Sequence, residues 1–376
     1  MSTTTINIFV ASDLHIGQKN ITKEIIDNLL VKIKENLSEL DLIILAGDET
    51  HTPTRLGSDV SSLLMDFLLE LNSFLVPVLV VKGTASHVGE YTKFARQLGI
   101  FKNIQFVDEV SEVNFKTISG RDLTILCVPE EYIPDQFEYY ADTIYNTSGK
   151  KWDIIVGHGT VDGFFMKSED SVEKSNPRAP VFKVGDLWNA APIVLFGHYH
   201  ISTQKRDGQN FFEYIGSWSA MDFSDTGDTK KADMITLKYD FGGNLLESTI
   251  TPIINDKSPQ LRELVIDSNN VAELFRIENY TNKNLKLIVH KYDLTEGNLK
   301  EFNKLKSVSA TVSYINDDFK ALDERVDLAY IDEISGKKIP EQIEEFVSDN
   351  YGKSLDLKFI TSYIDTGKGY EFNLAV

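Results

Sequence analysis

The stretch INIFVASDLHIG, residues 6–17, joins a short apolar run to a polar cluster that contains Asp13 and His15. The apolar run has the length and the β-branched content of a buried strand. Residues 21–40 follow with apolar side chains at three- and four-residue spacing, which is typical of an amphipathic helix, and a second apolar run comes directly after them. This order of strand, helix and strand predicts right-handed crossovers and a mostly parallel sheet that is covered on both faces.

The alternation covers the first 110 residues, and strand patterns continue to about residue 251. Further strands are predicted at residues 42–46, 76–81, 123–128, 154–156 and 193–196, a second helix at 60–74, and hairpins at 203–214 and 234–251. A linker at residues 255–259 precedes two strands at 285–290 and 308–315 with a helix at 296–305 between them, and then an acidic helix at 339–350. We therefore expect an α/β chain of two domains, residues 1–255 and a smaller one at 260–376.

Composition limits the class of protein. The 376 residues are 42% hydrophobic and 25% charged, which argues against a disordered or fibrous chain. Lys and Arg number 38 and Asp and Glu number 57, and the net charge of −19 argues against a broad basic face for nucleic acid. Because the sequence has one cysteine, Cys127, and no signal-peptide pattern at the N-terminus, we expect the protein in a reducing compartment, the cytosol. No apolar run approaches the roughly 20 residues of a membrane helix.

Six of the seven histidines, with two aspartates, follow the carboxyl ends of predicted strands. The clusters are SDLHIG at 12–17, GDETH at 47–51, GTASH at 83–87, GHG at 157–159 and GHYH at 197–200. Because the carboxyl ends of strands converge on one crevice in open α/β sheets, we expect these side chains to meet. Mixed imidazole and carboxylate ligands suit Mn²⁺, Fe²⁺ or Zn²⁺. These candidate ligands are too many for one tetrahedral site, so the sequence predicts two ions that share a carboxylate.

The order and spacing of these five motifs resemble those of calcineurin-like dinuclear metallophosphoesterases over the first 200 residues. The resemblance implies a four-layer α/β/β/α sandwich with a smaller C-terminal α/β capping domain, residues 260–376, that binds DNA or a partner. Within that superfamily the chain is most similar to the SbcD-type nucleases. GDETH places His51 three residues after Asp48, and YIGS at residues 214–217 is similar to the Y-P-G-S segment of that group.

The resemblance also implies a role for each motif residue. It implies two divalent ions, Mn²⁺ above all, held by Asp13, His15 and His200 for the first ion, by His158 and His198 for the second, and by Asp48 as the bridge between them. His87 would protonate the leaving oxygen or stabilise the transition state, and His51 would contact the phosphate. The chemistry implied is hydrolysis of a phosphodiester by an activated water.

The third motif departs from the family pattern. The family has G-N-H-D at this strand end, and its asparagine is a ligand of the second ion, whereas this chain reads GTASHVG at residues 83–89. Thr84 or Ser86 would offer a hydroxyl oxygen in its place, or a water would fill the position. We expect a weaker second metal site; the alternative is an inactive nuclease.

The function that the resemblance implies is a DNA nuclease that processes DNA ends in recombination or repair, acting on linear duplex ends or on single strands. It would be an exonuclease, with endonuclease activity left open. The resemblance further implies an SbcC-type ABC-ATPase as partner and the cytosol of a bacterium or of a bacteriophage-infected cell, with a homodimer left open and no membrane association. The acidic net charge keeps a first alternative open, a phosphoesterase for a small phosphoester or a nucleotide. A second alternative is a metal-stabilised binding subunit without turnover.

Other charged residues are given lesser roles. Glu130 and Glu131 and the acidic residues between 222 and 228 are expected to be solvated loop charges. Residues 165–184 are expected to form a long loop, in which Lys167, Lys174 and Arg178 either touch a phosphate backbone or are ordinary polar surface.

Overall fold

The computed structural model describes residues 3–55, 57–89, 91–130, 151–162, 181–259 and 261–266, together with Ile144, Gly149 and residues 285–290 and 312–315. The chain divides into two compact units. The first holds Met1–Leu264 with Tyr280–Lys286 and Ser309–Thr311, and the second holds the remaining residues.

The first unit contains two six-stranded sheets. The first sheet has the order β14-β13-β1-β2-β3-β4. Its strands are β1 (Thr4–Ala11), β2 (Leu42–Leu45), β3 (Val78–Val81), β4 (Ile104–Val107), β13 (Lys231–Tyr239) and β14 (Leu245–Ile254). β1 to β4 are parallel, and the hairpin of β13 and β14 adds two antiparallel strands beside β1.

The second sheet has the order β11-β12-β10-β7-β6-β5. Its strands are β5 (Ser111–Lys116), β6 (Asp122–Val128), β7 (Ile154–His158), β10 (Ile193–Gly197), β11 (Thr203–Asp207) and β12 (Asn210–Tyr214). β6, β7, β10 and β12 are parallel, whereas β5 and β11 are antiparallel to their neighbours. The register pairs Val128 with Gly157 and Gly197 with His158, so three strands end at the same level.

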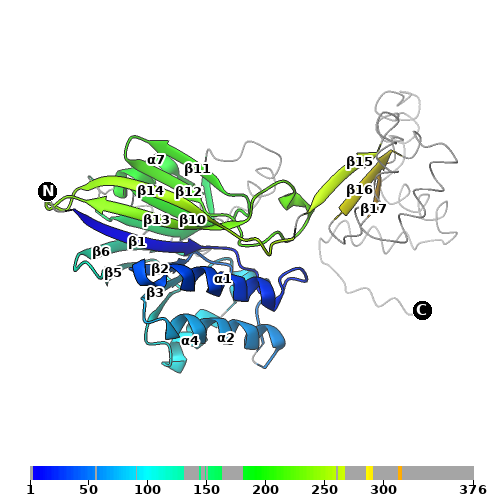
Figure 1. Cartoon of the computed structure of the whole chain (residues 1–376), viewed down its shortest axis with the longest axis horizontal. Coiled ribbons are helices and arrows are strands. Elements are labelled where there is room, and N and C mark those ends of the chain that lie inside the picture. The colour runs from blue at the N-terminus through cyan, green and yellow to red at the C-terminus, as the bar shows by residue number, and fades with distance from the viewer. Residues whose placement is uncertain are drawn as a thin grey trace, which may run out of the picture. The chain divides into compact units, whose positions relative to one another are not determined.

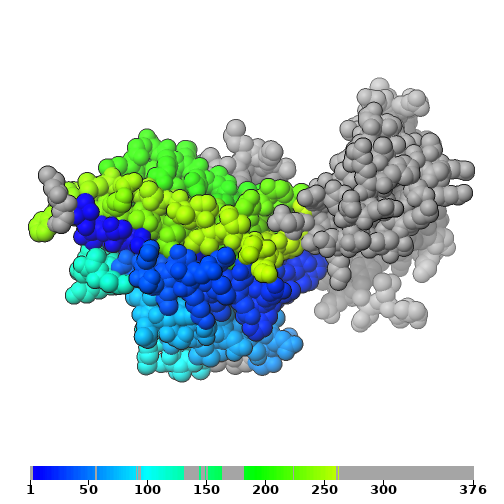
Figure 2. Space-filling model, in the orientation of Figure 1, coloured from blue at the N-terminus to red at the C-terminus, as the bar shows by residue number. Residues whose placement is uncertain are grey.

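Helices cover the outer faces of both sheets. The described helices are α1 (Lys23–Asn36), α2 (Asp59–Ser73), α3 (Ala85–Val88), α4 (Tyr91–Leu98) and α7 (Val184–Ala190). Figure 1 shows α1, α2 and α4 on one side of the first unit and α7 on the other, with the strands between them. In the space-filling view of Figure 2, the yellow-green band of β13 and β14 lies beside the dark blue residues of β1 and α1.

Three apolar cores hold these layers together. β1 illustrates how the sequence divides between them, because its side chains alternate between the two faces of the sheet. Phe9 and Ala11 belong to the core under α1, α2 and α4, and Ile8 and Val10 belong to the core between the two sheets. A third core joins the second sheet to α7. This four-layer α/β/β/α arrangement confirms the fold class predicted from the sequence.

Several elements differ from those predicted. The helix expected at residues 21–40 ends at Asn36 and continues as a 3₁₀ turn, Leu37–Glu39. β4 and β5 were not predicted, because four to six residues with mixed polar content give a weak pattern. The segment expected to be a loop up to residue 184 already contains the short strand β9, Val181–Lys183.

The structure describes three further strands after β14. β15 (Arg262–Ile266), β16 (Leu285–His290) and β17 (Val312–Ile315) form a three-stranded sheet in which β16 and β17 are parallel. These last two strands lie within the ranges that the apolar pattern predicts. The helices expected at residues 296–305 and 339–350 lie outside the described residues, as do Lys167, Lys174 and Arg178.

Candidate metal centre

The loops after β1 and β2 are joined to each other by backbone hydrogen bonds. The amide of Asp13 donates to the carbonyl of Gly47 at 3.0 Å, and the amide of His15 donates to the carbonyl of Asp48 at 2.9 Å. Ile16 and Thr50 then form an isolated parallel bridge. These contacts extend the β1–β2 pairing beyond the strands and set the first two motifs side by side.

The third motif is attached to the second by two further hydrogen bonds. The amide of Thr84 donates to Asp48 Oδ1 at 2.7 Å, and the hydroxyl of Thr50 donates to the carbonyl of His87 at 2.8 Å. The second sheet supplies the remaining motifs, since His158 ends β7 and His198 follows β10. The amide of His198 lies 3.1 Å from Asp13 Oδ2, so the two sheets meet at the site.

Four of the predicted ligands have a backbone conformation that costs free energy. Asp13, His15, Asp48 and His198 have φ angles of 51°, 45°, 53° and 100°. Among the described non-glycine residues, only Leu75 also has a positive φ. Such residues cost of order 1–3 kcal/mol each and cluster at functional sites. The strain is therefore concentrated on the side chains that the sequence assigns to metal binding.

Close packing of the motif backbones explains two of the glycines. A Cβ on Gly47 would lie 2.3 Å from His158 Nδ1, and a Cβ on Gly83 would lie 2.2 Å from Asp48 Oδ1. Gly47 also has a φ of 96°, which disfavours any side chain. Both positions therefore need glycine for the ligands to approach one another.

The first predicted ligand group is present as a cluster. Asp13, His15 and His200 each offer a ligand atom, and these atoms lie within 4.8 Å of one another. Nε2 of His15 is 3.8 Å from Asp13 Oδ1 and 3.2 Å from Nε2 of His200. Two imidazole nitrogens at this distance repel when both carry lone pairs, and a cation between them removes the repulsion. The cluster therefore fits a divalent ion.

Asp48 lies between the two predicted metal positions. Its Oδ2 is 3.2 Å from Nε2 of His158 and 4.0 Å from Nε2 of His15. The Nδ1 of His158 lies 2.8 Å from the carbonyl of Ala46, which can only accept, so Nδ1 carries the hydrogen. Nε2 is therefore the nitrogen that faces Asp48, an arrangement common to histidines that ligate metals.

Burial and charge determine protonation in this cluster. Burial opposes ionisation of Asp13 and Asp48, but the neighbouring histidines hold the pKa of both carboxyls below the usual range. Burial also opposes a charge on His158, yet Asp48, Asp13 and Glu130 raise its pKa to about 10. Without metal, His158 is thus an imidazolium paired with Asp48. A divalent ion would replace that positive charge.

Glu49 is a buried carboxyl beside the bridge. Its pKa rises to about 8, mainly because of burial and further because of the charge of Asp48. The hydroxyl of Tyr91 donates to its Oε2 at 2.5 Å. Glu49 is therefore neutral near pH 7 and adds no negative charge to the cluster.

His51 and His87 lie beside the first ligand group. The ring of His87 is 4.8 Å from the ring of His15, and that of His51 is 5.5 Å from it, centroid to centroid. His87 Nδ1 lies 2.5 Å from the carbonyl of His51, so Nδ1 carries the hydrogen and Nε2 is left to exchange a proton. Burial, followed by the charges of His15 and His87, lowers the pKa of His51.

The two hydroxyl residues proposed for the missing asparagine differ in position. Ser86 is exposed on α3. Thr84 lies within the site, where its Oγ1 is 3.4 Å from His158 Nε2 and donates to Glu130 Oε2 at 2.5 Å. The structure thus places Thr84 near the second group, in contact with a carboxylate.

Two expectations about surface charge are wrong. Glu130 was expected to be solvated, but it is only 5% exposed, because it follows β6, an inner strand of the second sheet, at the same end of the parallel strands as His158. Asp225 was also expected in a solvated loop and is 3% exposed. Lys230, missed by the sequence analysis, is buried and donates to Asp225 and to the carbonyl of His200, at 2.8 and 2.9 Å. Glu131 lies outside the described residues.

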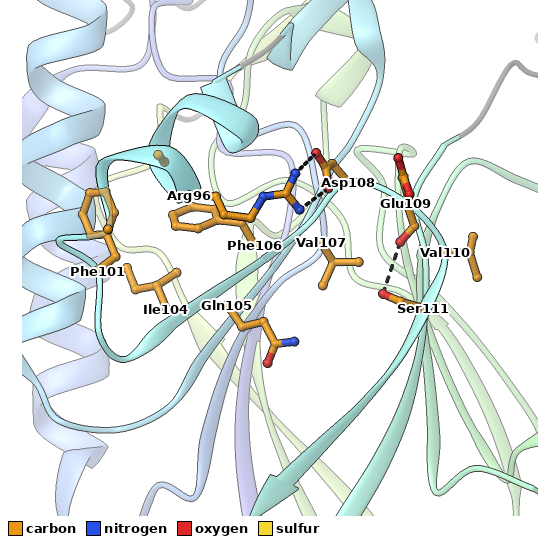
Figure 3. Close-up of a pocket in the computed structure, with 12 residues that line it drawn as sticks. Arg96, Phe101, Ile104, Gln105, Phe106, Val107, Asp108, Glu109, Val110 and Ser111 are labelled. Atoms are coloured by element: carbon orange, nitrogen blue, oxygen red, sulfur yellow. Dashed lines mark hydrogen bonds and ion pairs between the residues drawn. The ribbon is translucent and has the colours of Figure 1, made fainter.

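A separate pocket of about 500 Å³ lies at the α4–β4 edge of the first sheet. It is lined by residues between Ala95 and Ser111 and includes none of the predicted ligands. Arg96 forms a bidentate ion pair with Asp108 there, with nitrogen–oxygen distances of 2.8 and 2.9 Å (Figure 3). The candidate metal centre is therefore distinct from this pocket.

No helix within the described part of the chain is long and apolar enough to cross a membrane.

Comparisons with known proteins were made for the whole chain. No protein-family model matches it, and no curated protein matches it. Among solved structures it is similar to a predicted phosphoesterase from Streptococcus pneumoniae, at 13% identity, over 66% of this chain and 98% of that chain, with a TM-score of 0.26. A hypothetical protein from Thermus thermophilus is similar at 13% identity, over 66% and 99% of the two chains, with a TM-score of 0.39.

A third similar structure is wild-type Vps29 from Entamoeba histolytica complexed with Zn²⁺. Its identity is 12%, its coverage 67% of this chain and 100% of that chain, and its TM-score 0.27. At this level of likeness, the chemistry has to be derived from the side chains of this chain itself.

Proposed function

We propose that this chain is a metal-dependent phosphodiesterase that binds two divalent ions, Mn²⁺ by preference, and hydrolyses DNA. The observation that carries the proposal is the position of Asp48, whose Oδ2 faces both His15 and His158. A carboxylate in this position would be available to both ions of a two-metal hydrolytic site. Such ions, when bound, make a water more acidic and neutralise charge on the phosphate.

The side chains then have two kinds of role, metal ligand and catalytic group. The ligands of the first ion are Asp13, His15 and His200, the ligands of the second are His158 and His198, and Asp48 is shared. His87 is oriented by its hydrogen bond to the carbonyl of His51, which leaves Nε2 to give a proton to the leaving oxygen. His51 has a lowered pKa and contacts the phosphate as a neutral hydrogen-bond donor.

The DNA substrate is supported by the GDETH and YIGS segments, which are similar to those of SbcD-type nucleases. A net charge of −19 gives little affinity for a duplex by counterion release. The proposal therefore includes an SbcC-type ABC-ATPase that contributes positive surface, with residues 260–376 as the part of this chain that recruits it. The chain would work on DNA ends in this assembly.

The same net charge favours a second candidate function. An acidic protein that acts alone is better matched to a small phosphoester, whose binding depends on the metal centre rather than on a long anionic partner. The two candidates share the metal chemistry and differ only in substrate.

One assay series tests these functions. The purified chain, loaded with Mn²⁺, is given a chromogenic phosphodiester, a chromogenic phosphomonoester and end-labelled linear DNA, with and without the ATPase and ATP. The proposal predicts cleavage of the diester and ATP-stimulated digestion of DNA. Cleavage of the monoester alone would instead support the small-substrate function. Two bound ions with no turnover on any of the three would make the chain a binding subunit.

A further inference from the structure

We propose that Glu130 is a ligand of the second metal ion and takes the place of the asparagine that the GTASH motif lacks. This inference rests on the proposed function, because it assumes a metal pair at the site. It adds a ligand from the end of β6, a strand that contributes none of the five motifs.

The geometry places Glu130 in the second ligand group. Its carboxylate, a nitrogen of His158 and a nitrogen of His198 lie within 4.8 Å of one another. The side chain is buried, and its Cγ would lie 3.7 Å from a Cβ added to Gly159, the residue after His158. β6 pairs in parallel with β7, so Glu130 and His158 leave the sheet at the same edge. A buried carboxylate beside two imidazoles is a typical divalent-cation site.

Thr84 supports this ligand and does not replace it. Its hydroxyl donates to Oε2 of Glu130 at 2.5 Å, and its amide donates to Oδ1 of Asp48 at 2.7 Å. Both hydrogen bonds go to carboxylates at the second site and fix their orientation. Outer contacts of this kind typically change metal affinity by about 10- to 100-fold.

A carboxylate in place of a neutral amide changes the character of the site. The second ion would be held by Asp48, His158, His198 and Glu130, two of them anionic. The additional negative charge strengthens the binding of a hard divalent ion such as Mn²⁺. The second site is therefore as strong as the first, and the expectation of a weaker one no longer follows from the missing asparagine.

Calorimetric titration of the full chain with Mn²⁺ tests the ligand assignment without measuring activity. The wild type should bind two ions with similar affinities. Glu130→Ala should bind one ion with wild-type affinity, and its affinity for the other ion should fall by more than about 10-fold. Glu130→Gln keeps an oxygen but no charge, so its affinity for the second ion should lie between those of the wild type and Glu130→Ala. Thr84→Val should lower the affinity for the same ion.

The matched control is Glu109→Ala, which removes an exposed glutamate from the loop after β4 and should leave both affinities unchanged. Circular dichroism of each metal-free variant shows whether it is folded; if Glu130→Ala is not, Glu130→Gln and Thr84→Val decide. Two unchanged affinities in the folded Glu130 variants, or an equal loss at both sites, would overturn the inference. Fewer than two ions on the wild type would contradict the proposed metal pair itself.

Discussion

At the scale of single residues, the site depends on side chains held in costly backbone conformations. Asp13, His15 and Asp48 have positive φ angles, and their loops are fixed by hydrogen bonds between the motifs. Strain persists only where the surrounding structure enforces it. The fold thus stabilises ligand positions that the isolated loops would not adopt.

Asp48 is the residue with the largest expected effect on metal content. Asp48→Asn keeps the shape but removes the charge that lies between His15 and His158. We expect the bound metal to fall below two ions per chain and hydrolysis of a phosphodiester to be abolished. Elemental analysis of the purified variant and a diester assay measure both, with Asp66→Asn on the exposed face of α2 as the control. A variant with two ions and most of its activity would refute the shared ligand.

His87 is expected to act on the substrate and not on the metal. His87→Ser removes the ring whose Nε2 is free to exchange a proton, and a general acid contributes roughly 10²–10⁴-fold to a rate. The variant should keep both ions and still bind DNA while hydrolysis falls by that factor. Metal analysis and single-turnover rates distinguish this role from another, since loss of one ion in His87→Ser would make His87 a ligand.

At the scale of elements, the connection between β12 and β13 supports the last motif. Lys230 is buried in this connection and donates to Asp225, to Asp228 and to the carbonyl of His200. The amide of Ser217, at the end of the YIGS segment, donates to the same carbonyl at 3.0 Å. The backbone of GHYH is therefore positioned by residues outside the five motifs.

Lys230→Met tests this support. It leaves the buried carboxylate of Asp225 without its partner, which typically costs about 3–5 kcal/mol. The melting temperature should fall, and Mn²⁺ affinity at the first site should fall with it, because His200 loses a backbone anchor. The double variant Lys230→Met/Asp225→Asn should regain part of the stability. Thermal melts with and without Mn²⁺ provide the comparison, and an unchanged melting temperature would show that the contact is dispensable.

The sequence predicts the strands whose apolar pattern is strong, and it misses the roles of residues that depend on contacts between distant parts of the chain. The second half of β1 is apolar and buried on both faces, as are β2, β3, β7 and β10 apart from the last two residues of β7. The motif residues lie at or just after the ends of these strands. Glu130 was misjudged because a lone glutamate after a strand has no distinguishing pattern; its proximity to His158 and His198 exists only in the folded chain. Lys230 was missed for the same reason, since its partners are two carboxylates and one carbonyl.

At the scale of the whole molecule, protonation of side chains in the candidate metal centre makes the free energy of unfolding depend on pH. His158 has a pKa of about 10 in the folded metal-free chain, against an ordinary value of 6.5. A raised pKa contributes stability that is complete below about pH 6.5 and is lost as the pH rises to about 10. Glu49, with a pKa of about 8, adds to this loss only up to about pH 8.

The metal-free protein should therefore lose about 1.4 kcal/mol of unfolding free energy per pH unit from His158 between about pH 8 and pH 10. With metal bound, His158 has to be neutral, so this slope should disappear. Urea unfolding at several pH values, with Mn²⁺ and with a chelator, measures the slope. His158→Gln should lack the slope between about pH 8 and pH 9 in both conditions, below the range in which the buried thiol of Cys127, whose pKa burial raises, begins to contribute. Equal slopes for wild type with and without metal would mean that His158 does not exchange its proton for an ion.

The most direct test of the account is the number and spacing of the ions in the wild-type chain. Equilibrium dialysis against Mn²⁺ gives the stoichiometry, and electron paramagnetic resonance shows whether the ions are magnetically coupled. Two coupled ions per chain are predicted, because a carboxylate shared between His15 and His158 holds them close together. A single ion, or two ions without coupling, would contradict the shared role of Asp48 and with it the proposed phosphodiesterase.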